Sequence, residues 1–172
     1  MIETKPTTLI TTYLEMTSPS EFMPSYVKNE QVRIELLQGI DIDFYLFLYR
    51  GVGEQLAWRD RLLMPKEELV TALSKAHVYV LYVGGIPAGY VELETQGEDV
   101  EIAYFGLRKD YQGLGLGKHL LSYGIEKAWD MAPQRVYVHT CNLDGEYAMS
   151  NYLKRGFKVY KQLEEPMPER YL

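Results

Sequence analysis

A glycine-rich run at residues 111–118, Tyr-Gln-Gly-Leu-Gly-Leu-Gly-Lys, constrains the fold of this chain more than any other feature. It follows a strand-like segment, residues 100–107, and precedes residues 117–130, whose leucines and alanines recur at helical spacing. Such a loop exposes several backbone N–H groups beside the positive end of a helix. It therefore predicts a site for a phosphate or pyrophosphate, and a plain glycine-rich turn is an equally good interpretation of the loop taken alone.

Two better-known glycine motifs do not fit this run. The dinucleotide fingerprint Gly-x-Gly-x-x-Gly fails because Lys118 stands where its last glycine belongs. The P-loop pattern fails because Gln112 and His119 replace its first glycine and its hydroxyl residue. What remains is Gln-x-x-Gly-x-Gly, with its glycines at Gly115 and Gly117.

The composition limits the classes of function. A chain of 172 residues with 47% hydrophobic and 24% charged residues is expected to form one soluble domain with a sizeable core. The net charge is −6 and no basic stripe occurs, which argues against nucleic acid or an anionic membrane as the main partner. The apolar runs are too short to span a bilayer and the N-terminus lacks the form of a signal peptide, so we expect a cytoplasmic protein.

The sequence does not predict a metal site. The one cysteine, Cys141, permits neither an internal disulfide nor a cysteine-rich metal centre, and no partner that would activate it as a nucleophile is evident. His119 and His139 fall on different predicted elements without a third ligand, which favours packing or surface roles.

Hydrophobic periodicity predicts a mixed sheet with helices on its faces. Residues 78–107 resemble a three-stranded antiparallel meander, and Asp144 and Gly156 are candidate end residues of a late helix. The predicted strands are residues 8–16, 32–37, 78–83, 89–94, 100–107, 135–141 and 157–163, and the predicted helices are residues 44–53, 65–76, 117–130 and 145–154.

Two side chains near the loop are candidates for acid–base chemistry. A period of two places Glu101 on one strand face with Phe105 and Leu107, where partial desolvation would raise the pKa of its carboxyl group toward that of a general base. Spacing alone favours a glutamate that points to water. Tyr152 lies one helical turn after Ala148 and could supply a proton, or it could pack beneath the sheet.

Together these features resemble the GNAT superfamily of N-acetyltransferases, most clearly over residues 78–160. The family has an asparagine three residues before the alanine of its late helix, whereas Asn142 lies six residues before Ala148, as in an uncharacterised branch. The residues that carry the resemblance are Gln112, Gly115, Gly117, Ala148, Tyr152, Gly156 and Phe157, with the strand at residues 101–107.

The resemblance implies an α/β (α+β) fold in one domain, residues 1–172. It implies a mixed, mostly antiparallel, twisted sheet of about six to seven strands, with helices on both faces and with strands four and five splayed apart. Residues 78–163 would form the acetyl-CoA-binding core, and residues 1–77 would supply the acceptor site.

The resemblance also implies acetyl-CoA as co-substrate, and no metal. The pantetheine arm would lie along Phe105, Gly106 and Leu107, and Asn142 is a further candidate contact. The pyrophosphate would bind to the backbone of Gln112, Gly113, Leu114, Gly115, Leu116, Gly117 and Lys118.

The implied reaction is direct attack of a primary amine, from a small-molecule or peptide acceptor, on the thioester. Glu101 is the first candidate for the base and Glu92 the second, and Tyr152 would protonate the leaving thiolate. Three residues are candidates for binding an acidic or carboxylate-bearing acceptor, with ordinary core and surface positions as the alternative: Trp58, Arg59 and Arg61.

Two rival functions remain at this stage. A non-catalytic acyl-CoA sensor would need the loop but neither Glu101 nor Tyr152, and a transferase for a longer acyl chain would use the same cleft. The sequence leaves the acceptor and the oligomeric state, including a homodimer, open.

Overall fold

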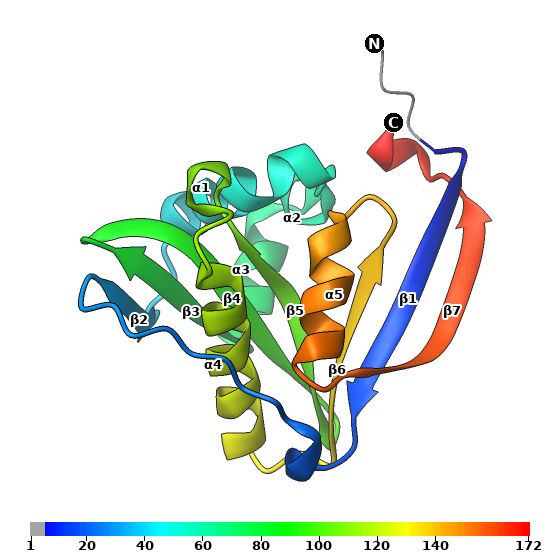
Figure 1. Ribbon diagram of the computed structural model, residues 1–172. Coiled ribbons are helices and arrows are strands. Elements are labelled where there is room, and N and C mark those ends of the chain that lie inside the picture. Colours follow the sequence, from blue (N-terminus) through cyan, green and yellow to red (C-terminus); the bar gives the residue numbers. More distant parts are fainter. Residues whose placement is uncertain (1–5) are drawn as a thin grey trace.

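A seven-stranded sheet with the order β2-β3-β4-β5-β6-β1-β7 forms the centre of the computed structural model, which describes residues 6–172 (Figure 1). All neighbouring strands are antiparallel except β5 and β6, so the prediction of a mixed, mostly antiparallel sheet is confirmed. Residues 1–5 of the predicted domain lie outside the described residues. The strands are β1 (Thr8–Met16), β2 (Val32–Leu36), β3 (Ala76–Val83), β4 (Ile86–Gln96), β5 (Asp99–Leu107), β6 (Arg135–Cys141) and β7 (Lys158–Pro166).

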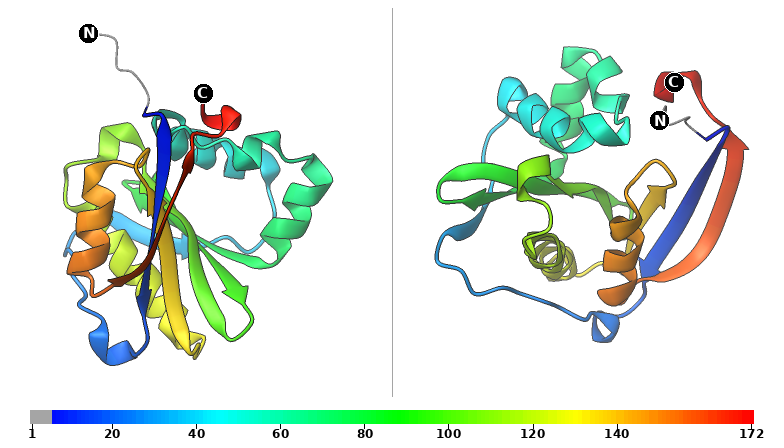
Figure 2. Two further views of the ribbon diagram at one scale, coloured as in Figure 1. Left: turned by 90° about the vertical axis from the view of Figure 1, so that its right-hand side faces the viewer. Right: turned by 45° about the horizontal axis from the view of Figure 1, so that its top comes forward.

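Helices cover both faces of the sheet (Figure 2). The helices α4 (Leu116–Asp130) and α5 (Glu146–Lys154) lie on one face, and α1 (Ile42–Gly53), α2 (Asp60–Leu63) and α3 (Lys66–Ser74) lie on the other. Each face has its own buried core. Within residues 6–172, no helix combines the length and the hydrophobicity that a membrane span requires. Short 3₁₀ turns occur at Pro19–Glu21, Glu54–Leu56, Lys109–Tyr111 and Glu169–Tyr171.

The two longer helices bury the stripes that their sequences predict. In α4 the buried side chains include Leu120, Leu121 and Ile125, which recur every three to four residues. In α1 the buried side chains Tyr45 and Leu48, with others one turn further on, form the same kind of stripe from aromatic and aliphatic residues. The sheet is therefore held between two independent apolar layers.

The N-terminal strand β1 lies in the interior of the sheet, where it pairs antiparallel with β6 on one side and with β7 on the other. The periodicity of residues 8–16 predicts the strand but not its neighbours, because both partners lie more than a hundred residues away in the sequence. As a consequence β7 becomes the outer edge strand, with every residue exposed.

A β-bulge in β5 marks the point where β5 and β6 separate. The pairing of β4 with β5 changes register between Glu92 and Leu93, so that Ala103 is an extra residue on β5. Parallel pairing with β6 is confined to Asp99–Ile102 on β5, although β5 continues to Leu107. The expected splay of the fourth and fifth strands of the family fold is thus confirmed between β5 and β6.

The bulge also reverses the face of the sheet to which each following residue of β5 points. Ile102 and Phe105 both pack in the core beneath α4 and α5, whereas Tyr104 packs in the core beneath α1. Glu101 precedes the bulge and lies opposite Glu94 on the α1 side. The prediction that Glu101 shares a face with Phe105 and Leu107 is therefore wrong, because it assumed an unbroken period of two.

The end of α5 depends on a glycine, as the sequence predicts. Gly156 has φ = +109°, and the N–H group of Phe157 donates to the carbonyl of Tyr152 at 3.1 Å. A Cβ atom on Gly156 would lie 2.0 Å from the carbonyl oxygen of Glu21. No side chain fits at this position without a shift of the backbone.

We expect Gly156→Ala to lower the free energy of unfolding by at least about 2 kcal/mol, because it adds a backbone clash to an unfavourable φ. Urea titration followed by circular dichroism measures this loss. Gly39→Ala is the matched control, since no atom lies within 4 Å of its added Cβ. Similar losses in the two variants would contradict the role given to Gly156.

Candidate functional site

The gap between β5 and β6 contains a cavity of about 360 Å³ that is lined from both faces of the sheet. Ala148 and Tyr152 of α5 contribute to it from one face. Tyr49 at the end of α1 and Trp58 before α2 contribute from the other. A molecule in this cavity could therefore meet a second molecule that enters from the opposite side of the sheet.

One wall of the cavity carries unused backbone groups. Residues 104–107 of β5 pair with β4 but not with β6, so their second edge faces the gap. An extended ligand can pair with such an edge in the manner of an added strand. On the other face of the strand α1 approaches Gly106 closely, since a Cβ atom there would lie 2.4 Å from Cγ1 of Val52.

The glycine-rich loop connects this strand to α4 and presents its amides. Gly113 and Gly115 have φ = +77° and +79°, and α4 begins without a side-chain cap. Within residues 6–172, the N–H groups of Gly113 through Gly117 donate no hydrogen bond to the rest of the chain. The side chain of Gln112 donates to the carbonyl of Leu107 at 3.2 Å and so fixes the loop against the end of β5. Free amides at the start of a helix are suited to binding an anion.

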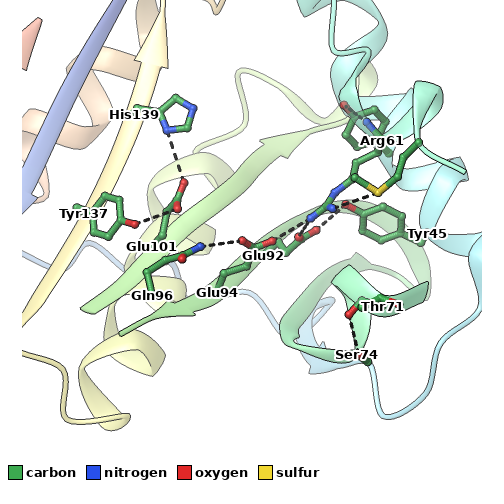
Figure 3. A network of polar contacts seen from close by, with 12 residues as sticks. Tyr45, Arg61, Thr71, Ser74, Glu92, Glu94, Gln96, Glu101, Tyr137 and His139 are labelled. Atoms are coloured by element: carbon green, nitrogen blue, oxygen red, sulfur yellow. Dashed lines mark hydrogen bonds and ion pairs between the residues drawn. The ribbon is translucent and has the colours of Figure 1, made fainter. Parts of the chain in front are cut away.

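Glu101 lines the cavity and is held by two side chains of β6 (Figure 3). The hydroxyl of Tyr137 donates to its carboxylate at 3.1 Å, and Nδ1 of His139 lies 3.6 Å from its other oxygen. Glu101 raises the pKa of His139 through this contact. His139 also lines the cavity, although its sequence context favoured a packing or surface role. The sequence feature that could have indicated this position is the alternation in β6, which places His139 and Tyr137 on the same face of the strand.

Tyr152 also contributes to the cavity. Its ring packs against Phe105 and Phe157, with centroids 6.1 and 5.9 Å away. Burial raises the pKa of its hydroxyl well above 10, so the phenol stays protonated at neutral pH. The arrangement suits a proton donor rather than a base.

Glu92 does not reach the cavity. Its side chain is completely buried, accepts a hydrogen bond from the hydroxyl of Tyr45 at 2.5 Å, and forms an ion pair with Arg61 at 2.8 Å. Burial raises the pKa of Glu92 to about 7, and the Arg61 guanidinium opposes this shift. We therefore withdraw Glu92 as a candidate base, because no acceptor can touch it.

The structure also changes the interpretation of the expected acceptor residues. Arg61 is buried and bound by Glu92 and Glu94 at 2.8 and 2.9 Å (Figure 3). Its guanidinium carbon lies 5.2 Å from the centre of the Tyr104 ring. Arg59 donates to the carbonyl of Trp58 at 3.1 Å. Arg61 is thus occupied by two carboxylates and has no charge left for a carboxylate-bearing acceptor.

Asn142 is the second candidate that the structure assigns elsewhere. Its side chain accepts from the N–H group of Ile10 at 3.0 Å and donates to the carbonyl of Thr8 at 2.9 Å. Asn142 therefore anchors the start of β1, and we remove it from the candidate CoA contacts. Asp144 likewise does not cap α5; it accepts from the hydroxyl of Thr140 at 2.7 Å.

Within the described part of the chain, no group of three or more histidine, cysteine or acidic side chains is arranged to hold a metal ion. The side chains that line the cavity include carboxylates, an imidazole, a guanidinium, a thiol and several phenols.

Comparison with known proteins identifies the family. The sequence model of the acetyltransferase (GNAT) family matches residues 45–157, a segment that includes β5, the glycine-rich loop and α5. The chain therefore belongs to the GNAT family, and the resemblance noted from its motifs is confirmed.

Individual relatives are similar over part of their length. The uncharacterized N-acetyltransferase YvbK of Bacillus subtilis is 32% identical over 104 residues, which are 58% of this chain and 66% of that protein. A catalase-peroxidase of Acidobacterium capsulatum is 32% identical over 84 residues, which are 49% of this chain and 11% of that protein. The chain thus spans less than two thirds of these curated relatives. A Bacillus subtilis acetyltransferase solved in complex with CoA superposes with a TM-score of 0.60 at 25% identity, over 76% of this chain and 78% of that one.

We expect Arg61→Met to lower the free energy of unfolding by about 3–5 kcal/mol near pH 8, because Glu92 would lose its cation and would have to be either charged and unpaired in the core or protonated far above its ordinary pKa. The folded-state pKa of Glu92 is raised from 4.5 to about 7. Its protonated form therefore contributes stability that is present below the unfolded pKa and is lost as the pH rises through the folded pKa. The cost of removing Arg61 should accordingly be much smaller near pH 5, where Glu92 is mostly protonated in the folded protein.

Urea unfolding of the parent and the variant at the two pH values measures both losses. Arg33→Met removes an exposed ion pair of 3.0 Å with Glu35 and serves as the control, with little expected effect. A loss that is equal at both pH values would show that Glu92 does not depend on Arg61 for its charge.

Proposed function

We propose that this protein transfers an acetyl group from acetyl-CoA to a primary amine. One observation carries the proposal: a single cavity contains the free edge of β5, Glu101, His139 and the hydroxyl of Tyr152, and the free amides of the loop follow directly from that edge. In this proposal residues 78–163 form the CoA-binding core. Residues before 78 supply the wall that the acceptor meets.

The cofactor would lie along the loop and the free strand edge. The pyrophosphate would accept hydrogen bonds from the amides of Gly113 to Gly117 at the positive end of α4. The pantetheine arm would pair with the backbone at Phe105 and Leu107, and a free N–H group of that edge would polarise the thioester carbonyl. A similar Bacillus subtilis acetyltransferase was solved in complex with CoA, which supports CoA as the ligand.

The chemistry requires two proton transfers. An alkyl ammonium group with a pKa near 10.4 costs on the order of 4–5 kcal/mol to deprotonate at pH 7, so the acceptor needs a base on its side of the cavity. Glu101 and His139 lie there. Attack on the thioester carbon breaks the C–S bond, and the departing thiolate takes the proton of Tyr152. A non-catalytic sensor would need neither Glu101 nor Tyr152, and the presence of both in the cavity favours an enzyme.

We expect Gly115→Asp to weaken CoA binding by at least about a hundredfold, because a carboxylate would oppose the pyrophosphate at the helix start. Isothermal titration with CoA measures the affinity. Gly97→Asp is the matched control: Gly97 also has a positive φ, +63°, and no atom within 4 Å of an added Cβ, but it lies in the turn between β4 and β5. If the two variants bind CoA equally well, the loop does not hold the cofactor.

The charge of the cavity indicates the kind of amine. The charge of Arg61 is already shared by two carboxylates, and Trp58 and Tyr104 add aromatic faces that attract cations. An acceptor that carries a second positive charge would therefore be favoured over a neutral or acidic amine. The ionisable lining is mostly acidic: Asp60, Glu94, Glu101 and Asp144, with Arg61 and His139 as the basic side chains.

Three acceptors of equal length test this preference: cadaverine, n-pentylamine and δ-aminovalerate, whose far ends are cationic, neutral and anionic. We expect kcat/KM for cadaverine to exceed that for n-pentylamine about tenfold, which corresponds to ~1.4 kcal/mol, and δ-aminovalerate to be the poorest. Release of the CoA thiol measures each rate.

Asp60→Asn should reduce the advantage of cadaverine, since it removes a carboxylate that lines the cavity and pairs with Arg170 at 3.3 Å. Glu98→Gln, in the turn between β4 and β5, should leave it unchanged. A preference for δ-aminovalerate would reverse the assignment of the acceptor, and turnover of no amine despite tight CoA binding would favour the sensor.

A further inference from the structure

His139 occupies a position in the cavity that suits a base better than Glu101 does. Its side chain is 48% exposed, whereas that of Glu101 is 15% exposed and already accepts a hydrogen bond from Tyr137. His139 belongs to β6, on the side of the gap that faces the free edge of β5. An acceptor in the cavity can reach the imidazole without displacing another contact of the protein.

The contact with Glu101 determines which nitrogen of the imidazole is available. Nδ1 faces a carboxylate oxygen at 3.6 Å, so the neutral ring is more stable with its proton on Nδ1, where a lone pair would meet the negative charge. The lone pair is then on Nε2. This nitrogen makes no hydrogen bond with the described residues and is directed away from Glu101 in Figure 3.

We propose that His139 takes the proton from the acceptor amine, and that Glu101 acts through His139 as a positioning residue. This inference rests on the proposed acetyltransferase function. It replaces the expectation that Glu101 is itself the base.

The steps balance as follows. The lone pair of Nε2 takes a proton from the ammonium group of the acceptor, which gives a neutral amine and an imidazolium. The amine nitrogen bonds to the thioester carbon, the C–S bond breaks, and the thiolate receives the proton of Tyr152. The new amide nitrogen loses its second proton, which restores Tyr152 through water, and the half-exposed imidazolium returns its proton to solvent. The products are the acetylated amine, CoA and one released proton.

The surroundings of His139 predict its pH dependence. Negative groups face it from three elements: Glu101 on β5, Asp60 on α2 and Asp144 before α5. The ring of Tyr13 on β1 packs 5.6 Å from the imidazole. Together the carboxylates raise the pKa of His139 above 6.5, with Glu101 as the largest cause and desolvation opposing it. Activity should therefore fall on the acid side as the imidazole becomes protonated.

The test is the pH profile of kcat/KM with cadaverine and acetyl-CoA for the parent and two variants. His139→Gln should remove the acid limb and lower kcat/KM about a hundredfold, within the usual range for loss of a general base. Glu101→Gln should shift the acid limb to lower pH, because the group that raises the pKa of His139 is gone. CoA affinity, measured by isothermal titration, should change in neither variant.

His77→Gln is the matched control, since this histidine lies on β3 and does not line the cavity. An acid limb that persists unchanged in His139→Gln would overturn the proposal. Imidazole added to His139→Ala should restore part of the rate, and no rescue in a folded variant would also count against it.

A readout that does not need turnover comes from nitrogen NMR of the parent protein. We expect His139 to carry its proton on Nδ1 when neutral, and its pKa to fall in Glu101→Gln. A proton on Nε2 would refute the proposal even if no amine were acetylated. Absence of turnover in the parent would by contrast contradict the proposed function itself.

Discussion

One extra residue in β5 determines the geometry of the site. The bulge at Ala103 ends the parallel pairing with β6 and exchanges the faces of the strand. Before it, Glu101 faces the helices that precede residue 78; after it, Phe105 faces α5 and packs on Tyr152. An unbroken strand would place Glu101 on the same face of the sheet as Phe105 and Tyr152. The bulge instead places Glu101 and Tyr152 on opposite sides of the gap between β5 and β6, as the roles proposed for Glu101, His139 and Tyr152 require.

The buried cluster of Arg61, Glu92 and Glu94 gives the gap its charge. It joins the four-residue helix α2 to the middle of β4 across the core, so the wall that carries Trp58 and Asp60 is fixed relative to the strands. Arg61 pairs with a second carboxylate as well. Glu92 is fully desolvated and its pKa is raised to about 7, so at neutral pH it carries only part of a negative charge. The second, Glu94, reaches the cavity and contributes negative charge there. The ion pairs of Arg61 thereby contribute to the charge of the cavity lining.

Local signals in the sequence predicted the parts of the fold that depend on neighbouring residues. The glycine pattern at Gly115, the apolar stripe of α4 and the helix stop at Gly156 are local, and the structure has all three where they were expected. The partners of β1, the bulge at Ala103 and the ion pairs of Arg61 depend on contacts between distant segments, which no period reveals. The role proposed for His139 was not predicted for a related reason: the alternation in β6 places His139 and Tyr137 on one face, but the contact with a carboxylate of another strand, 3.6 Å away, is not local.

The position of β1 between β6 and β7 explains how the sheet tolerates its gap. The second half of β6 has lost β5 as a neighbour, and a strand bonded on neither side would not hold His139 in one place. β1 pairs with β6 from Val136 to Cys141, so this half stays in a ladder on the side away from the cavity. Asn142 extends the connection by binding Thr8 and Ile10 immediately after β6 ends. Asn142 therefore supports the cavity indirectly, because it holds the end of β6 against β1 where β6 diverges from β5. The same contacts make β1 part of the support for His139, although β1 itself lines none of the cavity.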